Sequence, residues 1–250
     1  SMLKVALFAK KKIDRMAKYF SSLDVFTTFI SALCHDVEHP GLTNAYHINS
    51  QSDLALRYND QSVLENHHAH IAALLMKKPN CDILSGLTSE QRKKFRKTMI
   101  STILQTDMSV HQSIVAKFQN FLRQSEEFLG DDCKQFLVES LVHLGDLSNP
   151  VMDWPMSFEW ARRVIQEFYH QSLREKYQGL PVAGMEDKQP QSVSKVQTGF
   201  IDFIVTPLWK SACTLVPELD DRFEILQVNR QNWVEYGETA MCPPPVSKQC

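Results

Sequence analysis

The 250-residue sequence lacks any long hydrophobic run. A helix that crosses a bilayer needs about 20 consecutive apolar residues, so we expect no membrane span in this segment. The short apolar run at residues 5–9 precedes its lysines, whereas in a signal peptide the basic residues come first. The sequence therefore predicts a cytoplasmic protein, and membrane attachment through segments outside this sequence is left open.

An excess of charge of one sign is also lacking. The chain has 27 Lys and Arg against 29 Asp and Glu, with a net charge of −2. A nucleic-acid-binding surface usually requires a basic excess, so we expect no nucleic-acid partner. The six cysteines form no C-x-x-C pair, which favours reduced thiols over a disulfide framework or a cysteine zinc site. Nothing in the sequence predicts the oligomeric state.

The alternation typical of β-strands is essentially absent, and helical periodicity covers most of the chain. One predicted helix carries its apolar residues at 23, 26, 29, 30 and 33, with Pro40-Gly41 as its end. Further helices are predicted over residues 110–128, 132–147, 157–177, 192–206, 207–216 and 218–237. We predict one compact multi-helix all-α domain over residues 1–240 and a flexible tail at 241–250.

Two helix starts carry the spacing of a capping box. Ser62 with Glu65 predicts a helix that continues to residue 77, and Thr88 with Gln91 predicts a helix that runs towards residue 106. The stretch at 179–190 has the composition of a loop.

The most informative motif is His35-Asp36, followed by His39. On a helix His35 and His39 would share one face, with Asp36 about 100° round it. One turn could then offer imidazole and carboxylate to one or two divalent cations. Taken alone, the same residues also fit a hydrogen-bond network at a helix end.

Asp146 closes an apolar helical pattern. A carboxylate among core residues is costly unless it is paired, hydrogen-bonded or bound to metal. It could cap the turn at 148–150, or it could be a ligand. With His35 and Asp36 it makes a mixed N/O set suited to Zn²⁺, while an oxygen-rich site that shares Asp36 suits Mg²⁺ or Mn²⁺.

Five motifs in one order resemble the catalytic domain of the class I 3',5'-cyclic nucleotide phosphodiesterases. They are His35-Asp36-x-x-His39-Pro40-Gly41-x-x-Asn44, Leu64-Glu65-Asn66-His67-His68, Thr106-Asp107-Met108, Asp146-Leu147-Ser148-Asn149-Pro150 and Gln197-Thr198-Gly199-Phe200-Ile201-Asp202. The resemblance implies a binuclear metal site in a central pocket and hydrolysis of cyclic nucleotides to 5'-monophosphates.

Specific metal ligands follow from the resemblance. It implies that His35, Asp36 and Asp146 hold Zn²⁺, and that Asp36 bridges to a second ion, Mg²⁺ or Mn²⁺. Two such ions acidify a bridging water, so that hydroxide attacks phosphorus in line and expels the 3' oxygen.

Three further residues match family positions that hydrogen-bond the waters of the second ion, and we expect them to serve catalysis: His39, Glu65 and Thr106. Glu65 has a second explanation as the carboxylate of its capping box, and both can hold because a carboxylate has two oxygens. His67 and His68 are expected in buried hydrogen-bond networks.

Substrate recognition is predicted mainly on one helix. Gln197 and Phe200 are three residues apart, so the amide and the ring can engage one flat base. The resemblance assigns the purine to them, with Val164 on the other face, and adds Met108 and Asn149 to the substrate-binding set. Asn149 is common in enzymes that accept adenine, so cAMP is favoured, with cGMP as a second substrate.

One family motif is missing. The motif His-Asn-x-x-His-Ala, which supplies a general acid and another zinc ligand, would precede His35, and none of the nine histidines lies there. We therefore expect this sequence to be the last three quarters of a longer domain, and the isolated fragment to be impaired, because general acid catalysis contributes about 10²–10⁴-fold. Two other classes stay open: a catalytically incomplete cyclic nucleotide-binding or regulatory module, and a His-Asp phosphohydrolase acting on another phosphate ester.

Overall fold

The computed structural model describes residues 20–123, 131–182 and 193–237. All regular elements in these ranges are helices, which confirms the all-α prediction for the described chain. The predicted tail at 241–250 and residues 183–190 of the predicted loop lie outside the described residues, and the domain limits remain a prediction. Across the three described ranges, no helix is both long and apolar enough to cross a membrane.

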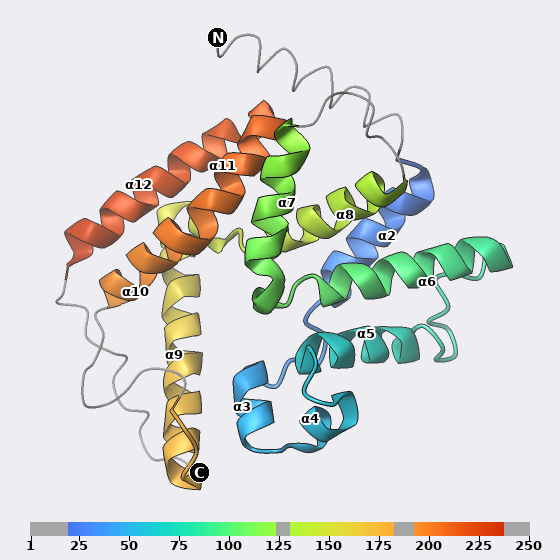
Figure 1. Ribbon diagram of the computed structural model, residues 1–250, viewed down its shortest axis with the longest axis horizontal. Helices are drawn as coiled ribbons and strands as arrows, with labels where there is room; N and C mark the ends of the chain where they lie inside the picture. The colour runs from blue at the N-terminus through green and yellow to red at the C-terminus, as the bar shows by residue number, and fades with distance from the viewer. Residues whose placement is uncertain (1–19, 124–130, 183–192, 238–250) are drawn as a thin grey trace.

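The helices form two groups (Figure 1). The N-terminal group comprises α2 (Ser22–Cys34), α3 (Asn44–Asn49), α4 (Asp53–Tyr58), α5 (Val63–Leu75) and α6 (Ser89–Leu104). Both α2 and α5 pack on α6.

The C-terminal group comprises α7 (His111–Arg123), α8 (Asp131–Asp146), α9 (Trp154–Gln178), α10 (Val193–Phe200), α11 (Thr206–Leu215) and α12 (Asp220–Tyr236). A π-helical turn, η3 (Ile201–Val205), joins α10 to α11, and short 3₁₀ turns lie at η1 (Met108–Val110), η2 (Asn149–Val151) and η4 (Pro217–Leu219). Because α8 also packs on α2 and α6, it connects the two groups (Figure 1).

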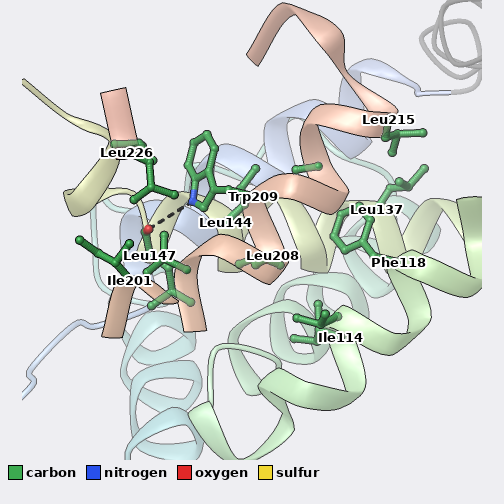
Figure 2. Close-up of a cluster of buried hydrophobic side chains, with 14 of the residues drawn as sticks. Ile114, Phe118, Leu137, Leu144, Leu147, Ile201, Leu208, Trp209, Leu215 and Leu226 are labelled. Atoms are coloured by element: carbon green, nitrogen blue, oxygen red, sulfur yellow. Dashed lines mark hydrogen bonds between the residues drawn. The ribbon is translucent and has the colours of Figure 1, made fainter. Parts of the chain in front are cut away.

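The larger apolar core lies within the C-terminal group. Figure 2 shows Phe118, Leu208 and neighbouring side chains converging from several helices. At the edge of this core the Trp209 indole N–H donates to the carbonyl of Leu147 at 3.3 Å, so the ring is both packed and hydrogen-bonded. Trp233 of α12 is 1% exposed, which places it among the most buried large side chains.

A smaller apolar core lies between α2, α5 and α6. It is built from Phe95, Met99 and Ile103 of α6 and from Ala69 and Ala72 of α5. The alanines lack long side chains, so the α5 backbone can approach α6 closely. This core holds α5, which carries several ionisable residues, against α6.

One of the two predicted capping boxes is confirmed. At the start of α6 the Gln91 N–H donates to Thr88 Oγ1 at 3.2 Å, and the Thr88 N–H donates to Gln91 Oε1 at 2.9 Å. The box predicted for Ser62 and Glu65 is wrong. Ser62 adopts a left-handed φ of 39° and makes no side-chain cap bond. Its hydroxyl donates instead to Asp107 Oδ2 at 2.7 Å, so a tertiary contact replaces the local one.

The helix predicted to run to Pro40 ends earlier. Helix α2 stops at Cys34, and Glu38 adopts a left-handed φ of 61°. His35 and His39 therefore do not share a helical face, which corrects the prediction. Pro40 disfavours the helical conformation only at His39, and the left-handed Glu38 shows that the chain has left the helix before the proline.

The segment between residues 43 and 61 carried no helix prediction, yet it holds α3 and α4. Both are capped by hydroxyl groups, with Thr43 accepting from the Tyr46 N–H and Ser52 from the Ala55 N–H. Each helix is only six residues long, too short for an apolar period to be recognised.

Candidate active site

Three side chains from distant parts of the sequence converge where the two helix groups meet. His35 and Asp36 follow α2, and Asp146 is the last residue of α8. His35 Nε2 lies 3.3 Å from Asp146 Oδ1 and 3.4 Å from Asp36 Oδ2. One ligand atom from each residue lies within 4.8 Å of the others. One imidazole and two carboxylates at this separation form a group that could hold a metal ion.

The His35 ring is oriented by its own helix. Its Nδ1 donates to the Ala32 carbonyl at 2.7 Å, which leaves Nε2 facing the two acids. Burial lowers the pKa of His35, but the hydrogen bond to Asp146 and the charge of Asp36 outweigh it and raise the pKa to about 9. The site therefore favours a positive charge at Nε2, and a bound cation would take the place of the proton.

The loop after Asp36 is held by α5. His68 Nδ1 donates to the Val37 carbonyl at 2.7 Å. The His68 ring also stacks on His39, with centroids 5.7 Å apart and an angle of 25° between the planes. On the far side the Gly41 N–H donates to His39 Nδ1 at 3.1 Å. Because burial lowers the pKa of His68, this ring acts as a neutral donor, as expected for a buried network.

Glu65 is oriented by Asn44. The Asn44 amide donates to both Glu65 oxygens, at 3.2 and 2.9 Å, and its oxygen accepts from the Leu64 N–H at 2.8 Å. Burial raises the pKa of Glu65, and the hydrogen bonds from Asn44 oppose that rise. Asn44 thus fixes both the first turn of α5 and its carboxylate.

Thr106 and Asp107 lie near this cluster at the end of α6. Thr106 is 7% exposed, and its hydroxyl donates to the Ile103 carbonyl at 2.7 Å. Asp107 is 8% exposed and accepts from the Ser109 N–H at 2.8 Å, in addition to its bond with Ser62. The negative charge of Asp107 adds to the rise in the pKa of Glu65.

A cavity of about 1030 Å³ opens beside the His35, Asp36 and Asp146 group. Its volume is at the upper end of the range for small-molecule sites. His39 lines the same wall as the three ligand candidates, and Asn149 and Val164 line it from the C-terminal group. The cavity therefore brings a mixed N/O cluster and an amide to one space.

The family model described as 3'5'-cyclic nucleotide phosphodiesterase matches residues 3–226. The chain belongs to this family.

Relatives and solved structures agree with this assignment. The 3',5'-cyclic-nucleotide phosphodiesterase regA of Dictyostelium discoideum is 37% identical over 223 residues, which is 89% of this chain and 28% of the relative. The 3',5'-cyclic-AMP phosphodiesterase 4C of Rattus norvegicus is 38% identical over 234 residues, or 90% of this chain and 43% of the relative. The crystal structure of the phosphodiesterase domain of the Salpingoeca rosetta rhodopsin phosphodiesterase matches with a TM-score of 0.82 and 34% identity, covering 88% of this chain and 68% of that one. The chain thus spans less than half the length of these two curated relatives.

The predicted substrate-binding residues of this phosphodiesterase-family chain do not all meet. Asn149 and Val164 line the cavity, whereas Gln197, Phe200 and Met108 are not among its described lining residues. Gln197 is 6% exposed on α10, and Phe200 packs against the larger apolar core. The interpretation of Gln197 and Phe200 as a base-binding pair remains a prediction.

The alternative prediction for Asp146, a cap of the turn at 148–150, is not what the structure has. The N-cap of η2 is Ser148, which makes no side-chain cap bond. The Asp146 carboxylate instead lies 3.3 Å from His35 Nε2. The His35 contact joins residues 111 positions apart, so no local pattern could have revealed it.

One residue that lines the cavity, Glu167, and one in the loop beside it, Glu38, were missed from the sequence. Glu38 occupies an unspecified position of the first motif, and its Oε2 lies 3.2 Å from His67 Nε2. Glu167 of α9 lines the cavity beside Gly41. Glu167 follows Val164 by three residues, so the face shared on a helix was the signal that could have found it. For Glu38, the only sequence feature that could have indicated a role is its place within the first motif.

Proposed function

We propose that this chain hydrolyses 3',5'-cyclic nucleotides to 5'-monophosphates, with cAMP favoured and cGMP as a second substrate. The observation that carries the proposal is the convergence of His35, Asp36 and Asp146 on one cavity. Family membership supports the reaction. Two relatives at 38% identity, from rat and Drosophila melanogaster, are 3',5'-cyclic-AMP phosphodiesterases, which supports the preference for cAMP.

For the metal ions, we assign Zn²⁺ to His35, Asp36 and Asp146, and Mg²⁺ or Mn²⁺ to a neighbouring position that shares Asp36. One imidazole with two carboxylates fits zinc, and carboxylate with water fits the harder ion. The Asp36 side chain is 60% exposed, so its oxygens are accessible from the cavity. When bound, the ions would polarise the phosphate and supply a nucleophile at neutral pH.

The residues assigned to catalysis can each act on water or phosphate through a defined group. His39 Nδ1 accepts from the Gly41 N–H, so its Nε2 carries the proton and can donate. Glu65 is held by Asn44 and offers oxygens as acceptors. We assign to His39, Glu65 and Thr106 the positioning of water beside Asp36.

For the substrate, we assign Asn149 and Val164 to the nucleotide side of the cavity, which they line. Gln197, Phe200 and Met108 are proposed to complete the base-binding set. The Gln197 amide can donate to and accept from one purine edge, and the Phe200 ring offers a face for stacking.

Two organisational proposals accompany this function. We place the phosphodiesterase domain at residues 1–240 with a tail at 241–250, and we place the protein in the cytoplasm. Limited proteolysis that leaves a stable fragment ending near residue 240 supports the first. Fractionation of cells, with the protein recovered in the cytosolic fraction, supports the second.

The test of the function is hydrolysis by the Asp146→Ala variant. We expect turnover of cAMP to fall by more than about 100-fold. Removing a residue that only orients a metal ligand costs up to about 100-fold, and loss of a ligand itself should cost more. The far-UV circular dichroism spectrum should change little. Asp132→Ala, on the same helix but far along it, is the matched control. Unchanged hydrolysis in Asp146→Ala would contradict the zinc assignment.

The same assay separates the other two classes. A panel of cAMP, cGMP and simple phosphate monoesters identifies a general phosphohydrolase by its turnover of the monoesters. Binding of cAMP without any turnover, at any added Zn²⁺ and Mg²⁺ concentration, would indicate a binding module instead.

A further inference from the structure

Glu38 has an unusual backbone conformation for its residue type. Its φ is +61°, in the left-handed region that side chains with a Cβ disfavour. Glycine would adopt this conformation without steric conflict. Replacement of Glu38 by glycine would therefore remove the side chain without straining the backbone.

The Glu38 side chain contacts a buried histidine. Its Oε2 lies 3.2 Å from Nε2 of His67, whose side chain is 11% exposed, while that of Glu38 is 59% exposed. The other ring nitrogen of His67 is buried and has no hydrogen-bond partner among the described residues. The carboxylate therefore provides the polar contact of this ring.

This contact acts on the loop that carries two assigned site residues. Glu38 lies between Asp36 and His39, and the residue before it, Val37, is bonded to His68. Consecutive loop residues are thus held by consecutive histidines of α5. Neighbouring residues on a helix point about 100° apart, so two contacts restrain the rotation of the loop as well as its position.

We propose that Glu38 is a positioning residue for the second cation site: its contact with His67 holds the left-handed turn that aims Asp36 and His39 into the cavity. This inference rests on the proposed function. It assigns to Glu38 an effect on cation affinity that is separate from any effect on the stability of the fold.

The test measures binding of Mn²⁺ alone to the chelator-treated protein, by electron paramagnetic resonance titration. We expect Glu38→Gly to weaken Mn²⁺ binding about tenfold, the size typical for residues that orient ligands. Its melting temperature should stay equal or rise, because glycine suits a positive φ. Gln51→Gly, at another non-glycine residue with positive φ (49°), is the matched control and should bind Mn²⁺ as the wild type does.

A double-mutant cycle locates the effect in the contact itself. Glu38→Gln and His67→Gln should each weaken Mn²⁺ binding, and the double variant should lose no more than the stronger single change, because both remove one interaction. Additive losses would overturn the proposal, as would wild-type affinity in Glu38→Gly. If the wild-type protein itself binds no Mn²⁺, the proposed function is wrong, and so is this inference, which rests on it.

Discussion

The N-terminal helices α2–α6 and the C-terminal helices α7–α12 are held together in different ways. Every described non-glycine residue with a positive φ lies in the first group, between residues 38 and 80. His68 there holds the loop after Asp36, and Asn44 holds the start of α5, each through hydrogen bonds. The first group therefore adds polar contacts that fix its turns to its smaller apolar core.

The C-terminal helices rely on a large apolar core. Trp233 stacks on Phe158 with centroids 5.4 Å apart and meets Trp154 edge-on at 4.9 Å. Asn229 adds two hydrogen bonds, to the carbonyls of Pro150 and Met152 at 2.8 and 2.7 Å, which tie α12 to the turn after α8. Asp146 reaches the site from the end of α8, whose apolar residues pack in this core, so one ligand candidate is set by packing and two by a loop.

The comparison predicts its largest loss of stability in the C-terminal core. Trp233→Ala should reduce the free energy of unfolding by about 3–5 kcal/mol, because it removes a fully buried aromatic side chain and leaves a cavity. Urea unfolding measures the change. Trp160→Ala, at a residue that is 40% exposed, should lose much less. Equal losses of stability in the two variants would contradict the conclusion that the buried aromatic core stabilises this group.

The next prediction concerns a buried pair of histidines within the C-terminal group. His143 of α8 is 0% exposed, and its Nε2 lies 2.9 Å from His111 Nδ1. Burial, and then the proximity of His111, lower the pKa of His143 to about 4. The folded protein thus binds fewer protons than the unfolded chain, so stability is present above pH 6.5 and is lost as the pH falls towards 4.

Between pH 7 and pH 5 this residue should remove about 2 kcal/mol from the free energy of unfolding. His143→Gln should flatten that dependence, as measured by urea unfolding at the two pH values. His170→Gln, at an exposed histidine of α9, is the control and should keep the wild-type slope. A parallel slope in His143→Gln and the wild type would show that the pair does not drive acid unfolding.

The Gln197→Ala variant tests whether α10 of the C-terminal group contributes to substrate recognition. We expect KM for cAMP to rise about tenfold through loss of the amide hydrogen bonds, with the zinc content unchanged. Gln112→Ala, on the exposed face of α7, should leave KM as it is. An unchanged KM in Gln197→Ala would count against base recognition by this residue.

The smallest expected effect concerns a buried hydroxyl group in the N-terminal group. Thr102 of α6 is 0% exposed, and its hydroxyl has no hydrogen-bond partner among the described residues. Thr102→Val should raise the free energy of unfolding by about 1 kcal/mol, because it removes an unsatisfied buried polar group at nearly constant volume. Thr98→Val should do the opposite, since the Thr98 hydroxyl donates to Gln135 Oε1 at 3.0 Å. A loss of stability in Thr102→Val, measured by thermal unfolding, would contradict this.

The sequence by itself determined the helical class and three of the residues that lie together beside the cavity, His35, Asp36 and Asp146. Apolar periods of 3.6 residues, and the hydroxyl–amide spacing at the start of α6, are local properties, so they could be recognised before any contact was known. The grouping of His35, Asp36 and Asp146 was also predicted, as a mixed N/O ligand set and from the order of motifs that resembles the phosphodiesterase family.

Only the tertiary structure decided how those residues are held. The left-handed turn at Glu38, the contact of Ser62 with Asp107 and the bond from Asn44 to Glu65 each join segments brought together by folding. A local pattern offers Ser62 and Glu65 a capping box, and the tertiary contacts compete with it and win. The reason is physical: local side-chain hydrogen bonds compete with the contacts that folding creates, and a sequence pattern shows only the local ones.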